Sequence, residues 1–122
     1  MKILYVEDEA HLREEIALIL EFEDHDVQTA SDGQYGLEMY DEFKPDLIIT
    51  DIKMPRLTGL DMLERIRERG DEDKTPAIVT SAFALREWKE RAAGLGVSAY
   101  LTKPFSLDQL VNAIGSSATS RN

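Results

Sequence analysis

The alternation of short apolar runs with amphipathic stretches constrains the fold of this chain more than any other feature of its sequence. The apolar runs are rich in β-branched residues, as strands are, and the stretches between them carry apolar residues at the helical period. The expected strands are Ile3–Val6, Val27–Ala30, Leu47–Thr50, Ala77–Thr80 and Ala99–Leu101. The expected helices cover Leu12–Leu20, Gly33–Phe43, Leu60–Arg69, Leu85–Ala93 and a segment that opens at Ser106. Strand–helix units in succession predict an α/β fold.

Three of the expected strands, Ile3–Val6, Leu47–Thr50 and Ala77–Thr80, are almost wholly apolar. Such strands are typical of a parallel sheet that helices cover on both faces. The sequence therefore predicts a doubly wound (βα)5 fold with three layers, in which a five-stranded parallel sheet lies between helices. The last helix has a clear start, because Ser106 and Gln109 have the spacing of a capping box.

The length of 122 residues and the apolar fraction of 43% suit one domain with a single core. We expect residues 1–115 to form that domain. Residues 116–122 are small and polar, so we expect them to form a C-terminal tail, either a frayed end or the stub of a linker.

The chain is strongly acidic, with 24 acidic and 14 basic residues. Such a surface repels phosphate backbones and anionic lipid headgroups, which argues against direct binding to nucleic acid or to membranes. There is no cysteine, so disulfides and thiolate metal sites are excluded. Acidic residues interrupt the apolar run at the N-terminus, unlike a signal peptide or a membrane span. We therefore expect a cytoplasmic protein.

In an open parallel sheet, ligands bind beyond the carboxyl ends of the strands, near the point where the winding reverses. The polar residues expected at those ends are Glu7, Asp8, Asp51, Thr80, Ser81 and Lys103. Clustered carboxylates repel one another unless a cation relieves them, and with no histidine or cysteine beside them the expected cation is Mg²⁺. The set predicts phosphate chemistry, in which a carboxylate is the nucleophile and Lys103 and Ser81 stabilise the phosphoryl oxygens.

Four segments of the sequence carry motifs of a known family. They are Val6–Glu9, Asp51–Pro55 with Gly59, Pro76–Ala82 and Tyr100–Phe105. These segments are spread over nearly the whole chain. Their order and spacing resemble those of the receiver domains of two-component response regulators. The family spacing selects Ser81 rather than Thr80 as the switch hydroxyl, at a position where threonine is the commoner residue.

The resemblance implies a flavodoxin-like sheet with strand order 2-1-3-4-5 and the function of a signalling switch. Such a domain is not an enzyme in the ordinary sense, because it catalyses only its own phosphoryl transfer and autodephosphorylation. The resemblance implies that Asp51 accepts a phosphoryl group from a phosphohistidine on a sensor histidine kinase or a histidine phosphotransfer protein. The signal would then pass to a downstream effector protein or to a fused output domain.

The resemblance also assigns roles to the residues around Asp51. Asp8 and Asp51 would ligate Mg²⁺ together with the backbone carbonyl of Lys53. Glu7 would act on the metal through a bound water. Lys53 and Phe83 occupy positions that border the phosphoryl group in the family, so we expect them to set the lifetime of the phosphorylated state.

Three further residues complete the set that the resemblance implies. Lys103 would hold a phosphoryl oxygen, and the Lys103–Pro104 peptide is expected to be cis, a form that proline makes accessible. Ser81 and Tyr100 would be the switch pair: the hydroxyl moves to the phosphate and the aromatic ring turns inward. This would change the surface made by the fourth helix, the fifth strand and the fifth helix.

Three other functions fit the sequence less well. A magnesium-dependent phosphatase with Asp51 as nucleophile needs a second acid two residues later, where this chain has Lys53. A flavin-binding domain needs a phosphate cradle after the first strand, where acids would repel the cofactor phosphate. A pseudo-receiver would not need the full set of acids, hydroxyl and lysine, and labelling with acetyl phosphate would distinguish it.

Some conspicuous residues are not assigned to this site. His11 and His25 lack metal-binding partners at suitable spacing, and we expect both to be exposed. Trp88 suits either packing or a contact with a partner. The charged run Glu64–Arg69 is expected to form i,i+4 pairs on a solvated helix face.

Overall fold

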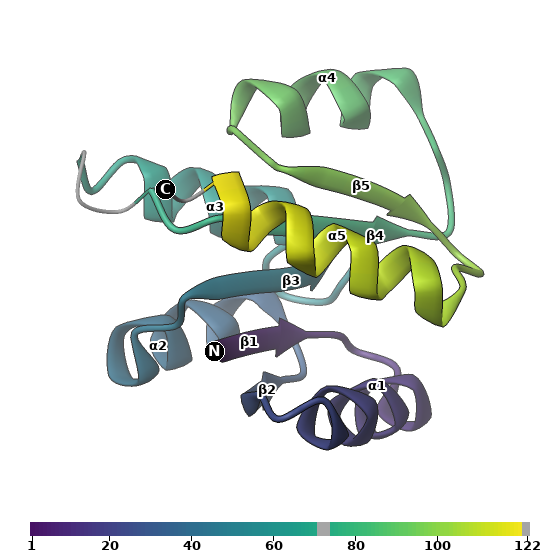
Figure 1. Ribbon diagram of the computed structural model, residues 1–122. Helices are drawn as coiled ribbons and strands as arrows, with labels where there is room; N and C mark the ends of the chain where they lie inside the picture. Colours follow the sequence, from purple (N-terminus) through teal and green to yellow (C-terminus); the bar gives the residue numbers. More distant parts are fainter. Residues whose placement is uncertain (71–73, 121–122) are drawn as a thin grey trace.

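The computed structural model describes residues 1–70 and 74–120, in which five strands alternate with five helices (Figure 1). The strands are β1 (Lys2–Val6), β2 (Asp26–Ala30), β3 (Leu47–Asp51), β4 (Ala77–Ser81) and β5 (Ala99–Thr102). The helices are α1 (Ala10–Phe22), α2 (Gly33–Phe43), α3 (Gly59–Arg67), α4 (Arg86–Gly94) and α5 (Leu107–Ser120). Each expected element is present, which confirms the (βα)5 pattern.

The strands form one parallel sheet in the order β2-β1-β3-β4-β5, as predicted. The winding reverses between β1 and β3, which are neighbours in the sheet. The register pairs Val6 of β1 with Thr50 of β3, and Asp51 of β3 with Thr80 of β4. The residues that follow β1 and those that end β3 and β4 therefore reach the same edge of the sheet.

Helices cover both faces of the sheet (Figure 1), and successive residues of a strand point to opposite faces. On one face, Ile3 of β1 shares a core with Leu20 of α1 and Leu110 of α5. On the other face, Leu4 of β1 shares a second core with Leu63 of α3. Each fully buried side chain of this size contributes about 1.5–3 kcal/mol through removal of apolar surface from water.

Helix α5 extends further than the sequence predicts. It runs to Ser120, so residues 116–120 of the expected polar tail are helical. Ser117 is buried, and its hydroxyl donates to the carbonyl oxygen of Ala113 at 2.8 Å, which satisfies a polar side chain inside the helix. No helix in the described part of the chain is long and apolar enough to cross a membrane.

The unassigned aromatic residues differ in their environments. Trp88 is partly buried against the core, and its ring meets that of Phe83 edge-on with 6.3 Å between centroids, so packing explains it. His11 is exposed, as expected. The expectation for His25 is wrong: it is half-buried, because the start of β2 lies against the N-terminus, and its Nδ1 lies 3.2 Å from the amine of Met1.

The charged run Glu64–Arg69 connects α3 to its neighbours. The Glu64 carboxylate accepts from the Arg91 guanidinium of α4 at 2.7 Å, and Arg69 forms an ion pair with Asp41 of α2. These pairs cross between helices, whereas the sequence predicts pairs along one helix. They are partly exposed, so each is expected to contribute at most about 1 kcal/mol.

Candidate functional site

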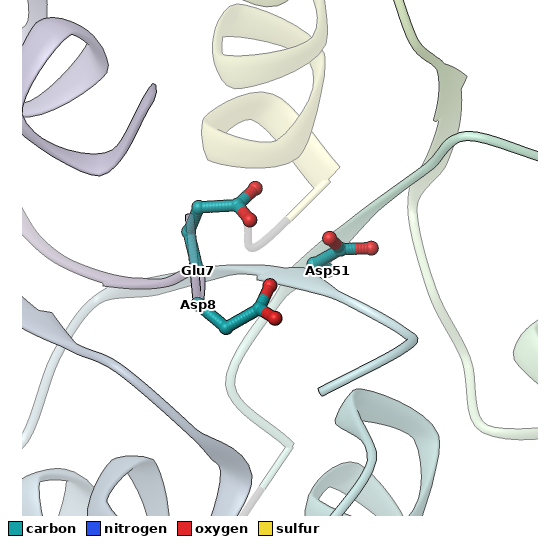
Figure 2. A group of neighbouring side chains, drawn as sticks. All are labelled: Glu7, Asp8 and Asp51. Atoms are coloured by element: carbon teal, nitrogen blue, oxygen red, sulfur yellow. The ribbon is translucent and has the colours of Figure 1, made fainter. Parts of the chain in front are cut away.

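Three carboxylates meet at the edge of the sheet where β1 and β3 end. Glu7 and Asp8 follow β1 directly, and Asp51 is the last residue of β3. One carboxylate oxygen from each residue lies within 4.8 Å of the others. Figure 2 shows the three side chains grouped at the ends of their strands. The structure thus brings together the acids that the sequence predicts to converge.

The three acids differ in burial. Glu7 has no exposed surface and Asp51 is only 7% exposed, whereas Asp8 is exposed. Burial raises the pKa of Glu7, because it disfavours the charged form, and the Lys103 ammonium and the Glu9 amide oppose this effect. The cluster therefore has a buried interior and one side that is open to solvent.

Lys103 lies between two of the carboxylates. Its backbone N–H donates to the carbonyl oxygen of Ser81 at 2.7 Å, which fixes the loop after β5 against the end of β4. Its Nζ donates to Glu7 Oε1 at 2.6 Å and to Asp51 Oδ2 at 2.8 Å. Burial acts to lower the pKa of Lys103, but the hydrogen bonds to Asp51 and Glu7 outweigh burial and raise it. The Lys103–Pro104 peptide is cis, as expected.

The segment after β1 is held by the start of α1. The Glu9 carboxylate caps α1 by accepting from the backbone N–H groups of His11 and Leu12, at 3.2 and 2.5 Å. The Arg13 guanidinium donates to the backbone carbonyl of Glu7 at 2.8 Å. These contacts tie the backbone of residues 7–9 to the start of helix α1.

The predicted switch residues are both bonded to the backbone of Phe83. Ser81 Oγ accepts from the Phe83 N–H at 3.1 Å, and the Tyr100 hydroxyl donates to the Phe83 carbonyl at 2.7 Å. The Lys89 ammonium lies over the Tyr100 ring, 5.8 Å from its centroid. One residue of the β4–α4 loop thus connects the two side chains, and the sequence pattern gives no sign of that connection.

The residues expected to tune the phosphorylated lifetime are at the surface. Lys53 is exposed, and Phe83 is 53% exposed although its ring contacts Trp88. Both follow a site residue closely, Lys53 after Asp51 and Phe83 after Ser81. Neither side chain is bonded to the carboxylates in the described structure, and both lie on the solvent side of the site.

The donor set fits a hard divalent cation. The described cluster consists of carboxylates alone, which are the ligands that Mg²⁺ prefers. The exposed side, at Asp8, leaves room for the water ligands that Mg²⁺ usually retains. A carboxylate beside a cation and the Lys103 ammonium is an arrangement that can accept a phosphoryl group, because both positive charges stabilise the equatorial oxygens in the transition state.

Sequence reasoning missed one residue beside this site. Tyr5 is fully buried in β1, and its hydroxyl has no hydrogen-bond partner among the described residues. A polar aromatic in an otherwise aliphatic strand, two residues before Glu7, is the signal that could have identified it, because alternate residues of a strand share a face.

Mg²⁺ should raise the melting midpoint of the wild-type protein, and Asp8→Ala should remove most of that rise. The folded cluster binds the ion and the unfolded chain does not, which stabilises the fold by about 2.7 kcal/mol at about 100 times the Kd. Thermal melting with and without Mg²⁺ measures the effect. Glu38→Ala, at an exposed acid of α2, is the matched control and should keep the full rise. An equal rise in Asp8→Ala would contradict the site.

The chain matches a known protein family over most of its length. Residues 3–115 match the response regulator receiver domain family. The chain is 41% identical over 114 residues to the transcriptional regulatory protein PdtaR of Mycobacterium tuberculosis, and the match covers 93% of this chain and 54% of that protein. The chain spans about half the length of the curated relatives that it matches.

Solved structures share the fold over almost the whole chain. The N-terminal domain of an uncharacterized protein from Wolinella succinogenes is 37% identical with a TM-score of 0.88, and the match covers 99% of this chain and 96% of that one. The response regulator TrrA from Thermotoga maritima, in complex with Mg²⁺ and BeF, is 27% identical with a TM-score of 0.83. That match covers 95% of this chain and 97% of TrrA.

Proposed function

Since this chain belongs to the response regulator receiver domain family, we propose that it is a phosphoacceptor switch in which Asp51 takes up the phosphoryl group. The observation that carries the proposal is the position of Asp51, which ends the central strand β3 with Asp8 and Glu7 beside it and Lys103 Nζ 2.8 Å from its Oδ2. The phosphoryl donor is a phosphohistidine on a sensor histidine kinase or a histidine phosphotransfer protein.

In the proposed transfer, a carboxylate oxygen of Asp51 attacks phosphorus in line with the leaving imidazole. The new P–O bond forms as the P–N bond breaks, and the imidazole, protonated on its other ring nitrogen, departs neutral with the electron pair of the P–N bond. Lys103 turns to one phosphoryl oxygen and Ser81 donates to another. Both stabilise charge that is present only once the phosphoryl group has arrived.

The remaining residues of the cluster would hold the metal. Asp8, Asp51 and the backbone carbonyl of Lys53 are the proposed ligands, and Glu7 acts through a bound water. Mg²⁺ held there would supply positive charge for the equatorial oxygens during transfer. Both oxygens of Glu7 already accept hydrogen bonds, from Lys103 and from the Glu9 N–H, which suits it to an indirect role, whereas Asp8 is exposed.

Phe83 supports a route from phosphorylation to the surface. When the Ser81 hydroxyl turns to the phosphoryl group, it no longer accepts from the Phe83 N–H, and that peptide becomes free to shift. A shift of Phe83 weakens the bond between its carbonyl and the Tyr100 hydroxyl, so the ring of Tyr100 can turn inward. The surface of α4, β5 and α5 then changes between two states.

The output of the switch lies outside this domain. We place the body of the domain at residues 1–115, with the last turn of α5 beyond it, and the output in a partner protein or in an attached domain. The greater length of the curated relatives supports an attached domain. The net charge of −10 argues against direct nucleic-acid binding by the domain itself. We place the protein in the cytoplasm, where histidine kinases transfer their phosphoryl groups.

Intact-mass spectrometry after incubation with acetyl phosphate tests the proposed function. The wild-type protein should gain one phosphoryl group with Mg²⁺ and little when the metal is chelated. If the protein gains no phosphoryl group in the presence of Mg²⁺, the proposal is wrong and the domain binds its partners without phosphorylation. An equal gain in the absence of metal would contradict the proposed role of the carboxylate cluster.

Ser81→Ala should still accept a phosphoryl group on Asp51 yet fail to reach the active surface. Ser81 offers one hydroxyl donor to a phosphoryl oxygen, so its bond biases only the phosphorylated state. A hydrogen bond to a charged group contributes roughly 1.5–3 kcal/mol, which shifts a two-state equilibrium about ten- to hundredfold. Backbone amide NMR shifts in α4 and β5, with and without beryllofluoride, measure the change. Shifts equal to those of wild type would exclude the hydroxyl as the coupling group.

Lys53→Asn and Phe83→Glu should shorten the lifetime of the phosphorylated state, and the double variant should shorten it most. Hydrolysis needs a water in line with the aspartyl-phosphate, and neither a long cation nor a bulky aromatic side chain orients water well. Lys53 can also pair with phosphoryl oxygens in the ground state. Loss of radiolabelled phosphate under saturating Mg²⁺ measures the rate. Unchanged decay in all three variants would remove both residues from the mechanism.

A further inference from the structure

Tyr5 lies in the middle of β1 with its side chain fully buried. It belongs to the apolar core between the sheet and helices α1 and α5. Its hydroxyl has no hydrogen-bond partner in the part of the chain that the structure describes. Buried tyrosine hydroxyls usually have a partner, because losing water without a replacement bond is unfavourable. Phenylalanine would serve packing alone, so the hydroxyl needs another explanation.

Glu7 follows β1 directly, and its N–H continues the pairing with β2 by donating to the Ala30 carbonyl at 3.0 Å. Its side chain therefore lies on the same face of the sheet as that of Tyr5. The pKa of Tyr5 is raised, first by burial, then by the negative charges of Glu7 and Asp51, and also by an interaction of its hydroxyl with the Glu7 side chain. The hydroxyl therefore stays protonated, and it lies near enough to these carboxylates to be affected by their charge. It is a donor beside the site whose contact with Glu7 falls short of a well-formed hydrogen bond.

Glu7 is the carboxylate that would lose a partner when Asp51 is phosphorylated. It is fully buried, and its Oε1 and Oε2 accept from Lys103 Nζ at 2.6 Å and from the Glu9 N–H at 3.1 Å. Lys103 also donates to Asp51, so a phosphoryl group there draws the ammonium away from Glu7. Among its bonds to protein groups, Glu7 would then keep only the longer, uncharged one from the Glu9 N–H while it remains buried. A buried carboxylate in this state needs a replacement donor.

We propose that Tyr5 is a positioning residue that acts through Glu7. Its hydroxyl donates to the Glu7 carboxylate when Lys103 turns from Glu7 to the phosphoryl group. Glu7 thereby stays in place for its role at the metal, and the phosphorylated state gains a full hydrogen bond where the resting state has only a weak contact. This inference rests on the proposed phosphorylation of Asp51.

Tyr5→Phe removes only the hydroxyl, and binding of beryllofluoride at saturating Mg²⁺ reports its effect on the phosphorylated state. We expect binding to weaken about tenfold, as for the loss of one hydrogen bond to a charged group. The melting midpoint without ligands should be unchanged or higher, because no well-formed bond is removed and a buried polar group is lost. Tyr40→Phe is the matched control: the Tyr40 hydroxyl lies 2.9 Å from Thr75 Oγ1, before the start of β4 and so at the opposite edge of the sheet. Its loss should lower the midpoint and leave beryllofluoride binding unchanged.

A second measurement observes the hydroxyl itself. In protein labelled with ¹³C at the ring carbon that bears the hydroxyl, the Tyr5 resonance is the one absent from Tyr5→Phe. It should move downfield when Mg²⁺ and beryllofluoride bind to the wild type. Equal binding by Tyr5→Phe and wild type, or weaker binding without this movement, would overturn the role of Tyr5. Failure of the wild type itself to bind beryllofluoride would instead overturn the proposed function.

Discussion

Asp51→Asn will take up no phosphoryl group from acetyl phosphate in the presence of Mg²⁺, whereas the wild-type protein will take up one. The amide lacks the anionic oxygen that attacks phosphorus. Among the described residues, no other carboxylate of the central strand is bonded to Lys103. Glu7 also contacts Lys103, but it is fully buried and so lies out of reach of a donor protein. The expected loss is therefore complete rather than partial.

Two controls separate loss of the acceptor from loss of the fold. Asp51→Asn should unfold in a cooperative thermal transition like that of the wild type. Asp26→Asn makes the same chemical change at an exposed acid of the edge strand β2 and should leave the uptake unchanged. A phosphoryl group that persists in Asp51→Asn would show that the acceptor is elsewhere.

Gly59→Ala will destabilise the fold by about 3 kcal/mol, at the upper end of the range for overpacking. Gly59 begins α3 against the end of β3, and its N–H donates to the carbonyl of Ile52 at 2.9 Å. A β-carbon there would overlap the carbonyl oxygen of Asp51 and lie 2.8 Å from Thr50 Oγ1. Backbone cannot rotate away as a side chain can, so the end of β3 must shift and carry Asp51 with it.

Gly115→Ala is the matched control for this substitution. A β-carbon at Gly115 in helix α5 meets nothing within 4 Å, and alanine is favoured over glycine in helices by roughly 0.5–1 kcal/mol. This variant should therefore melt at or above the wild-type midpoint, while Gly59→Ala melts well below it and binds Mg²⁺ more weakly. Urea unfolding of the three proteins measures the differences in the free energy of unfolding. Equal stability of Gly59→Ala and wild type would contradict the close contact.

The fold was predictable because its signals are local. Runs such as Leu47–Thr50 are almost wholly apolar, which indicates a strand covered on both faces, and β3 is buried along its length. The capping box of Ser106 and Gln109 is present at the start of α5, with bonds of 2.8 and 3.0 Å. The convergence of Glu7, Asp8 and Asp51 followed from the same pattern, because parallel strands end at one edge.

The features that the sequence did not predict depend on distances between remote segments. The bonds from Ser81 and Tyr100 to the backbone of Phe83 require the β4–α4 loop to lie against β5, which no periodicity encodes. The half-burial of His25 likewise depends on the packing of the N-terminus against β2. The helical end of α5 was missed because its small polar residues resemble a tail, whereas buried Ser117 satisfies its hydroxyl within the helix.

The central claim is that Asp51 forms an acyl phosphate, and borohydride trapping tests it most directly. Borohydride reduces an aspartyl-phosphate to homoserine, so peptide mass mapping identifies the residue that carried the phosphoryl group. After treatment with acetyl phosphate and Mg²⁺, we predict homoserine at residue 51 and at no other aspartate. Homoserine at another position, or none in protein that has gained a phosphoryl group, would contradict the account.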